Sequence, residues 1–282
     1  MKKKTPTKIA LVTDSTADIP LNLREKHQID VVPVSLQIEG ESYIDGISLS
    51  REEFYNWMPS MKTPASTAAP SVGSFAEHYE KLLSSGAEKI ISVHVAAALS
   101  GVYNAARLAA RSFGERVHVF DSGQLSLGIG FQVIEAADAI AQNLPIAGIL
   151  QAMTDLQKRL KLFAVLDTLE YLHRSGRVSW AKARIGSLLD LKPIIEMTYS
   201  KVVNIGAVRT TRVANKRMRD MLNDVGAIEK LAVLHTNAEA RARQFLADVA
   251  PNLSSPPLVV NVTPAIGAHL GPNGLGFAAV KK

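Results

Sequence analysis

The stretch Lys8-Ile9-Ala10-Leu11-Val12-Thr13-Asp14-Ser15-Thr16 places a short apolar run directly before three polar residues. A run of this length, rich in β-branched side chains, is typical of a buried strand. In an open α/β sheet, ligands bind outside the carboxyl ends of the strands, which is where residues 14–16 would lie. The stretch therefore predicts the first strand of such a sheet, with a polar loop at its end.

Similar short runs recur along the chain, with segments of helical periodicity between them. The predicted strands span residues 8–13, 31–38, 89–95, 116–120, 162–166, 230–235 and 258–262. This alternation indicates a mostly parallel sheet with helices on its faces. We therefore predict two α/β domains, the first spanning residues 1–155 and a second, smaller one spanning residues 156–282.

Two capping-box patterns predict where helices begin. Ser50 is followed three residues later by Glu53, and Ser74 is followed in the same way by Glu77. In each pattern the serine side chain can accept from a backbone N–H of the first turn. The apolar residues behind both patterns recur on one helical face, so we assign them to the core.

The composition indicates a globular chain without disulfides. Of the 282 residues, 47% are hydrophobic and 21% are charged, which is too apolar for a disordered protein. There is no cysteine, which excludes disulfides and thiolate ligands and suits a reducing cytoplasm. Polar residues interrupt the most apolar region, so we expect no membrane insertion. The seven histidines are scattered, so no metal or cofactor is expected.

Basic residues exceed acidic ones by 32 to 26, and the densest basic stretch runs from residue 209 to residue 219. A surface for nucleic acid would usually interleave aromatic side chains for stacking on bases, and this stretch has none. A solvated helix face is therefore the preferred interpretation, and nucleic-acid binding is kept as an alternative.

Three polar clusters follow strands of the first domain and should meet at one edge of the sheet. They are residues 14–16, residues 99–101 and residues 121–123. Ser100 also precedes a helical segment, whose free amide groups could hold a carboxylate or a phosphate. The alternative is that Asp14, Ser100 and Ser122 only cap helices.

Two further loops could carry function. Residues 63–71 are bracketed by prolines, and residues 267–276 place His269 in a glycine-rich turn. The chain has no phosphate-binding loop, nucleophile elbow or zinc-protease pair. A serine-dependent acyl hydrolase that uses Ser100 or Ser122 with His269 remains an alternative, although no motif supports it.

The order of the motifs resembles the DegV family over nearly the whole chain. The motifs are VTDSTAD (12–18), YIDG (43–46), LSGVYNAA (99–106), DS (121–122), LEYLHRSGRVS (169–179), LKP (191–193) and the turn around His269. Each motif is weak alone, but the ordered series is specific.

The resemblance implies a fold and a function. It implies two α/β domains, with the second built on a mixed sheet. The first domain would hold a lipid tunnel and the second would close a cleft around the lipid carboxylate. The chain would bind a long-chain fatty acid such as palmitate or oleate and catalyse nothing itself. A separate ATP-dependent fatty-acid kinase of phospholipid metabolism would phosphorylate the presented carboxylate.

The resemblance also implies site residues. The carboxylate would be bound by Thr67 and His269, with Ser66 and Ser100 close by. Further residues of the cleft would be Ser122, Ser126 and Gly101, and Arg177 would belong to the face that meets the kinase.

The chain departs from the family pattern near the expected head group. Positions where the family usually has hydroxyl or amide side chains are Ala68, Ala69, Ala96, Ala97 and Val102. Losing a hydroxyl leaves tail binding intact, because the tail dominates affinity. It could however mark a lipid with a different polar end.

Overall fold

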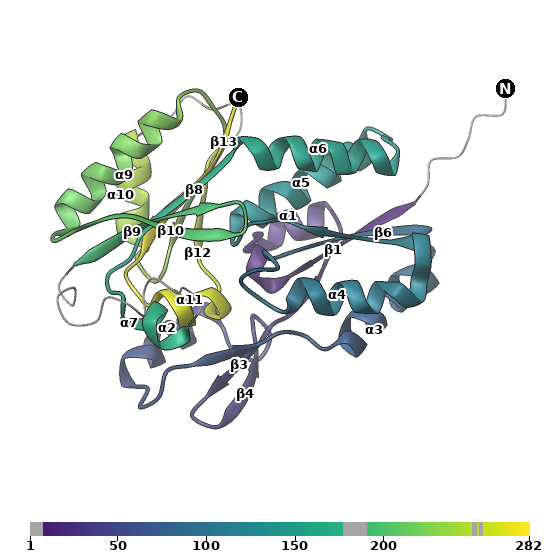
Figure 1. Cartoon of the computed structure of the whole chain (residues 1–282), viewed down its shortest axis with the longest axis horizontal. Coiled ribbons are helices and arrows are strands. Elements are labelled where there is room, and N and C mark those ends of the chain that lie inside the picture. Colours follow the sequence, from purple (N-terminus) through teal and green to yellow (C-terminus); the bar gives the residue numbers. More distant parts are fainter. Residues whose placement is uncertain (1–7, 177–190, 250–252, 254–255) are drawn as a thin grey trace.

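The opening stretch forms β1 (Ile9–Asp14), an inner strand of a four-stranded parallel sheet. The computed structural model describes residues 8–176, 191–249, 253 and 256–282. The sheet has the order β2–β1–β6–β7, with β2 (Ile29–Val32), β6 (Lys89–His94) and β7 (Val117–Asp121). Four helices flank it, α3 (Val72–Ser84) and α4 (Val102–Ala110) on one face and α5 (Leu127–Ala141) and α6 (Ile146–Arg159) on the other (Figure 1). The predicted parallel sheet with flanking helices is confirmed.

A second sheet of six strands is mixed, as expected for the second half. Its order is β10–β9–β8–β13–β11–β12, and only β11 and β12 pair in parallel. The strands are β8 (Leu160–Val165), β9 (Lys192–Thr198), β10 (Lys201–Val208), β11 (Ile228–His235), β12 (Leu258–Asn261) and β13 (Leu275–Lys281). Helices α9 (Thr211–Val225) and α10 (Glu239–Val249) cover one of its faces.

The predicted strand over residues 31–38 is two strands in different sheets. Residues 29–32 belong to β2, and the chain then turns at Pro33 into β3 (Ser35–Ile38). A proline cannot donate a ladder hydrogen bond, which explains the break. β3 forms a small antiparallel sheet with two further strands, β4 (Glu41–Ile44) and β5 (Ser66–Ala68).

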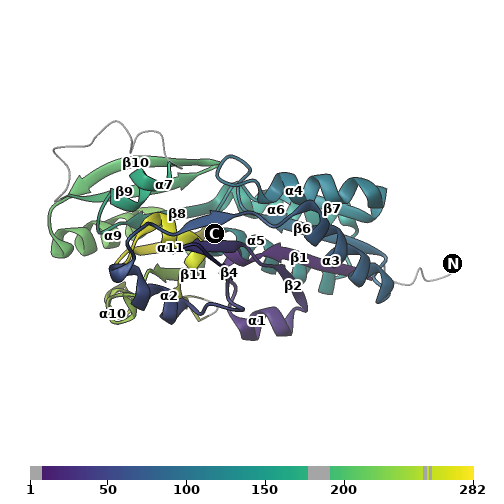
Figure 2. The same cartoon turned by 90° about the horizontal axis from the view of Figure 1, so that it is seen from below.

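Short helices connect these layers. They are η1 (Ser15–Ala17), α1 (Leu21–Lys26), α2 (Arg51–Trp57), η2 (Met58–Ser60), η3 (Arg111–Arg116), α7 (Glu170–Ser175) and α11 (Pro264–Leu270). Seen from below in Figure 2, α11 lies between the second sheet and α2. It contacts α7, α2, η1, β3 and β5, so elements from both halves of the chain surround it.

One of the two predicted capping boxes is confirmed and the other is wrong. The Ser50 side chain accepts from the N–H of Glu53, and Glu53 accepts from the N–H of Ser50. In the second case the helix begins three residues earlier than predicted. Ser71 is the N-cap, and its hydroxyl accepts from the N–H of Ser74 at 3.0 Å.

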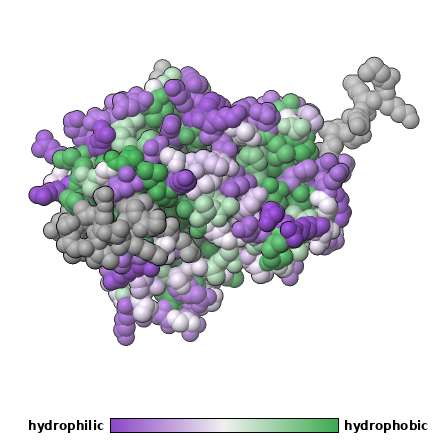
Figure 3. Space-filling model, in the orientation of Figure 1, coloured by the Kyte–Doolittle hydropathy of each residue, from purple (hydrophilic) through white to green (hydrophobic). Residues whose placement is uncertain are grey.

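The β9–β10 hairpin joins the second sheet to the loop that follows β7. The Ser200 N–H donates to the Gly123 carbonyl at 2.9 Å, and the Tyr199 ring covers Gly123. A Cβ at position 123 would lie 2.5 Å from that ring, so a glycine is required there. Figure 3 shows hydrophobic surface over this hairpin, where Val203 and Ile205 are partly exposed.

One apolar cluster links the first sheet to part of the second. It includes Leu11 and Ile91 from the parallel sheet, and Leu162 and Leu234 from the mixed sheet. Position 155, the predicted end of the first domain, lies inside α6. The boundary between the domains therefore stays a prediction.

Candidate functional site

Thr67 and His269 lie side by side, although 202 positions separate them in the chain. Thr67 Oγ1 is 3.0 Å from His269 Nε2, and both side chains are partly buried. Thr67 is the middle residue of β5, so its side chain points to the face opposite Ser66 and Ala68. The pair that the family resemblance assigned to one site is brought together by α11 and the small sheet.

The Thr67–His269 pair lines a cavity that is partly open to solvent, with about 640 Å³ of empty space when the open part is included. Among the described residues, the polar side chains that line it are those of Thr16, Thr67, Ser100 and His269. The other described lining residues are apolar, and they are Val34, Val95, Leu99, Leu125, Leu172, Val202, Ala265, Ile266 and Leu270. We call this space the polar-end cavity.

A second cavity, with about 580 Å³ of empty space when the part open to solvent is included, adjoins the first. The two cavities share five lining residues, which are Leu125, Leu172, Val202, Ile266 and Leu270. Further lining residues include Leu162, Ala164, Leu166, Ile195, Met197 and Leu234. We call this space the apolar cavity. We call the two adjoining cavities together the channel, and Thr16, Thr67, Ser100 and His269 lie at one end of it.

The alternation of β8 explains why the apolar cavity lies on this side of the sheet. Leu162, Ala164 and Leu166 line the cavity. Phe163 and Val165 point the other way and pack in the cluster under α9 and α10. Because successive residues of a strand face opposite sides, one face of the sheet is closed by its own helices and the other faces the channel.

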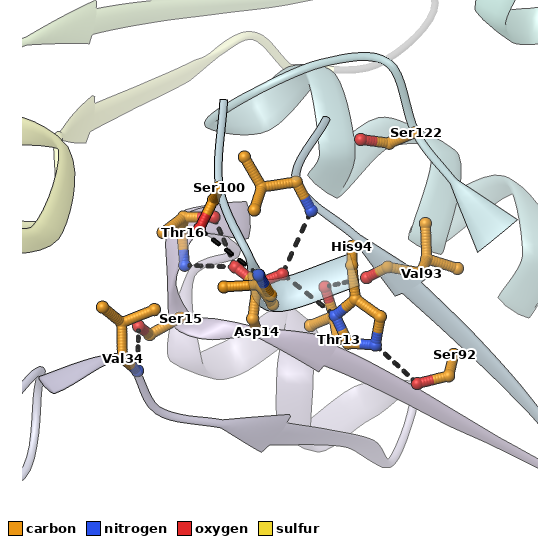
Figure 4. A network of polar contacts seen from close by, with 12 residues as sticks. Thr13, Asp14, Ser15, Thr16, Val34, Ser92, Val93, His94, Ser100 and Ser122 are labelled. Carbon is orange, nitrogen blue, oxygen red and sulfur yellow. Dashed lines mark hydrogen bonds and ion pairs between the residues drawn. The ribbon is translucent and has the colours of Figure 1, made fainter. Parts of the chain in front are cut away.

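A chain of buried polar contacts lies behind Thr16. The Thr16 hydroxyl and N–H both donate to Asp14, which also accepts from the N–H of Val95 at 3.1 Å. His94 Nδ1 lies 3.0 Å from Asp14 Oδ2, and its Nε2 lies 2.6 Å from Ser92 Oγ (Figure 4). These contacts fix Thr16 at the polar end of the channel.

Ser92, His94 and Asp14 have the order of a catalytic triad, but they are all buried. Ser92 and His94 are fully buried and Asp14 is 1% exposed. Ser92 Oγ also contacts the Tyr79 hydroxyl at 2.8 Å, and none of the described cavities is lined by Ser92 or His94. A nucleophile must reach its substrate, so we assign this chain of contacts to structure.

A second buried network holds the residue before α11. Thr263 donates its N–H to Asp18 at 2.9 Å and its hydroxyl to Asp45 at 2.6 Å. Burial raises the pKa of Asp18 from 3.8 to about 6, although Arg51, 3.1 Å away, lowers it. Burial also raises the pKa of Asp45. These carboxylates carry a desolvation cost that hydrogen bonds only partly offset.

The other predicted site residues divide into two groups. Ser100 lines the polar-end cavity, where its Oγ accepts from the N–H of Val102 at 3.4 Å. Ser126 lines the apolar cavity and donates its hydroxyl to Asp18 at 2.6 Å. Ser66, Gly101 and Ser122 line neither cavity.

Ser122 illustrates why a buried serine need not belong to a site. Its hydroxyl accepts from the N–H of Gln124 at 3.1 Å and donates to the carbonyl of the same residue. Figure 4 shows Ser122 on the far side of the network from Thr16. The Ser66 side chain is exposed, and Gly101 precedes α4. Arg177, predicted to meet a kinase, lies outside the described residues.

Sequence reasoning missed most of the channel wall. Leu172, Val202, Ile266 and Leu270 come from α7, β10 and α11, and nothing in their local sequence separates them from ordinary core residues. Thr16 belongs to the polar cluster 14–16 that the sequence analysis puts at the edge of the sheet, but it is not among the site residues that the family resemblance implies.

The basic stretch at residues 209–219 lies at the start of α9 and just before it. Two of its side chains form ion pairs, Arg219 with Asp248 at 2.8 Å and Lys216 with Asp220 at 2.9 Å. These pairs favour the interpretation as a solvated helix face.

The described part of the chain has neither a cluster of metal ligands nor a membrane-spanning helix. Within residues 8–176, 191–249, 253 and 256–282, no three histidine or acidic side chains cluster as metal ligands would. Within the same residues, no helix combines the length and the apolarity needed to cross a membrane.

The chain has an α/β fold with two adjoining, mainly apolar cavities, one of which is lined by a hydroxyl and an imidazole. Comparison with known proteins supplies the family. The DegV family model matches residues 8–282, and the chain belongs to the DegV family. A DegV domain-containing protein of Staphylococcus aureus is 32% identical over 98% of this chain and 100% of its own length. One from Listeria monocytogenes is 32% identical over 96% of this chain and 97% of its own.

Solved structures of DegV family proteins have the same fold as this chain. A fatty-acid-binding DegV family protein from Thermus thermophilus superposes with a TM-score of 0.89 at 28% identity, over 98% of this chain and 100% of that one. DegV, a fatty acid binding protein from Bacillus subtilis, superposes with a TM-score of 0.87 at 30% identity, with the same coverage. The fold inferred from the sequence is that of these proteins.

Proposed function

We propose that this protein binds a long-chain fatty acid, with its alkyl chain in the apolar cavity and its carboxylate beside Thr67 and His269. The observation that carries the proposal is the pair of adjoining cavities, which share five apolar lining residues and have these two side chains at one end. The two solved relatives named as fatty-acid-binding proteins support it.

The magnitudes favour a ligand with a long tail. Burying about 14 methylenes at roughly 0.8 kcal/mol each contributes on the order of 11 kcal/mol before entropy costs. A hydrogen bond to a charged group contributes about 1.5–3 kcal/mol. Tail burial therefore sets the affinity, and the polar end sets the orientation. The alanines at positions 96 and 97 remove hydroxyls only from the smaller of these two contributions.

The proposed position of the tail differs from the expectation for the first domain. The sequence-based interpretation placed a tunnel within residues 1–155. Most residues that line the apolar cavity come instead from positions 162–276, on β8, β9, β10, β11, β13 and α11. We therefore place the tail against the mixed sheet, with the parallel sheet contributing Thr16 and Ser100 to the polar end.

Native mass spectrometry tests this proposal directly. Purified protein should carry co-purified acyl chains, and stripped protein should rebind palmitate or oleate with 1:1 stoichiometry. Octanoate is the matched control, because its polar end is identical and its tail is too short to fill the apolar cavity. Protein that stays free of lipid at saturating palmitate and oleate would contradict the proposal.

We further propose that the bound carboxylate is presented to a separate ATP-dependent fatty-acid kinase and that this chain performs no catalysis. The buried triad-like chain supports a non-catalytic role, because its serine and histidine line none of the described cavities. Acyl phosphate should form only when lipid-loaded protein, a bacterial fatty-acid kinase and ATP are combined. Turnover of activated acyl esters by this chain alone would contradict it.

A further inference from the structure

The segment before α11 is held at successive residues by side chains from the first half of the chain. The Tyr55 hydroxyl donates to the carbonyl of Val262 at 3.0 Å. Arg51 donates to the carbonyl of Asn261. Both donors lie on α2, so this helix holds the segment on which α11 begins.

Thr263 then makes two contacts with buried carboxylates. Its N–H donates to Asp18 and its hydroxyl donates to Asp45, at 2.9 and 2.6 Å. All three residues are at most 3% exposed. Asp18 also accepts from the Ser126 hydroxyl, so one carboxylate joins the start of α11 to a residue of the apolar cavity.

The hydroxyl of Thr263 is not used in the way expected of a residue at its position. Thr263 is the N-cap of α11, where a threonine side chain usually accepts from a backbone N–H of the first turn. No such capping bond is present, because the hydroxyl points to Asp45. The Thr263 hydroxyl therefore does not cap α11 and instead donates to Asp45, 218 residues away in the chain.

The helix that starts at this point is short and closely fitted. Gly267 lies against Tyr55, and a Cβ there would approach the Tyr55 hydroxyl oxygen to 2.4 Å. α11 is therefore fixed at its start by Asp18 and Asp45 and in its middle by Tyr55. His269 follows within the next turn, so a displacement of the start would carry the imidazole with it.

We propose that Asp45 is a positioning residue of the lipid site. By accepting the Thr263 hydroxyl, it fixes α11 so that His269 Nε2 lies opposite Thr67 Oγ1. This assigns a role to the YIDG motif, which lines neither cavity of the channel. The effect on bound lipid rests on the proposed function, but the effect on the His269–Thr67 geometry does not.

The test compares Thr263→Val, which removes the hydroxyl, with Thr263→Ser, which keeps it. Thr154→Val is the matched control, since the Thr154 hydroxyl donates to the carbonyl of Leu150 on α6, away from the channel. The first readout is the ¹⁵N spectrum of the His269 imidazole in lipid-free protein. Thr263→Val should shift these signals, whereas Thr263→Ser and Thr154→Val should leave them at wild-type positions.

The second readout uses palmitate labelled with ¹³C at its carboxyl carbon. Thr263→Val should shift the carboxyl resonance and weaken binding about fivefold, as expected when a charge-assisted hydrogen bond is distorted rather than removed. Thr263→Ser should restore both.

Unchanged His269 signals in folded Thr263→Val overturn the proposal. If that variant does not fold, Asp45→Asn serves as the test. The amide oxygen of the asparagine can still accept a hydrogen bond from the Thr263 hydroxyl, but a weaker one than the carboxylate accepts. Asp45→Asn should give a smaller shift in the same direction, and the absence of any shift overturns the proposal. If wild-type protein binds no palmitate, the proposed function fails while the lipid-free spectra still test the positioning role.

Discussion

The two ends of the channel are built in opposite ways. The apolar cavity is formed by side chains such as Leu162, Ala164 and Leu234, which need only suitable size and shape. The polar end depends on buried networks, in which Asp14 holds Thr16, and Asp18 and Asp45 hold the start of the helix that carries His269. Under the proposed function, the affinity and the orientation of a bound lipid are determined by separate parts of the molecule. Changes at the two ends should therefore have different signatures.

Filling the apolar cavity should have the largest effect. Ala164→Trp places an indole where about five methylenes would lie, which costs about 4 kcal/mol of binding and lowers palmitate affinity by about 10³-fold. A twelve-carbon acid should lose much less. Ala207→Trp, at an exposed position of β10 in the same sheet, is the control. Equal losses for long and short acids, measured by calorimetry, would contradict the assignment of the tail to this cavity.

Removing the Asp18 charge should change how stability depends on pH. Its folded pKa, about 6, lies above the ordinary value of 3.8, so its contribution is fully present below about pH 4 and is lost as pH rises toward 6. The loss is on the order of 3 kcal/mol. In Asp18→Asn that loss disappears, which should show as a flatter dependence of unfolding free energy between pH 4 and 7 in urea titrations. Parallel curves for the two proteins would refute this.

Removing the imidazole should have a smaller effect on affinity than filling the cavity. His269→Ala deletes one hydrogen bond to a carboxylate, which should cost about 2 kcal/mol, or about 30-fold in palmitate affinity. The loss should be similar for acids of twelve and sixteen carbons, since both share the same head group. His78→Ala, on α3 and paired with Asp30, is the control. A loss that grows with chain length would place His269 along the tail instead.

The smallest effect should come from Ser100. Its Oγ accepts from a backbone N–H at 3.4 Å, so its own hydrogen is available to a ligand. Ser100→Ala should cost about 1 kcal/mol, about fivefold in affinity, and should shift the ¹³C resonance of a bound carboxyl. Ser122→Ala should lower thermal stability and leave that resonance unchanged. If Ser122→Ala shifted the resonance and Ser100→Ala did not, Ser122 and not Ser100 would be assigned to the carboxylate site.

Local sequence predicted most strands of the parallel sheet, but it missed β9, β10 and β13 of the mixed sheet. β1, β6, β8 and β11 were found because their residues are apolar and their ends are marked by polar turns. β13 was missed because its small residues and its position in a glycine-rich segment are more typical of a turn. β9 and β10 carry Pro193 and Gly206, which weaken a strand pattern.

Residues of the candidate site were predicted only where they belong to a sequence motif of the family. Thr67 and His269 came from resemblance to the family, and no local pattern predicts that a residue of β5 contacts a residue of α11. The channel wall could not be predicted, because leucines that line a cavity have the same local sequence as leucines that fill a core. Only the packing of distant elements decides whether space is left between them.

One face of the six-stranded sheet packs under α9 and α10, whereas side chains of its other face share one apolar cluster with the parallel sheet, and this limits how the chain can be divided. If residues 156–282 were expressed as a separate fragment, the apolar side chains that pack against the parallel sheet would meet water. An uncovered apolar surface of that kind drives self-association. We expect such a fragment to be recovered as aggregates, and to be recovered in a defined 1:1 complex only when it is produced together with the N-terminal portion.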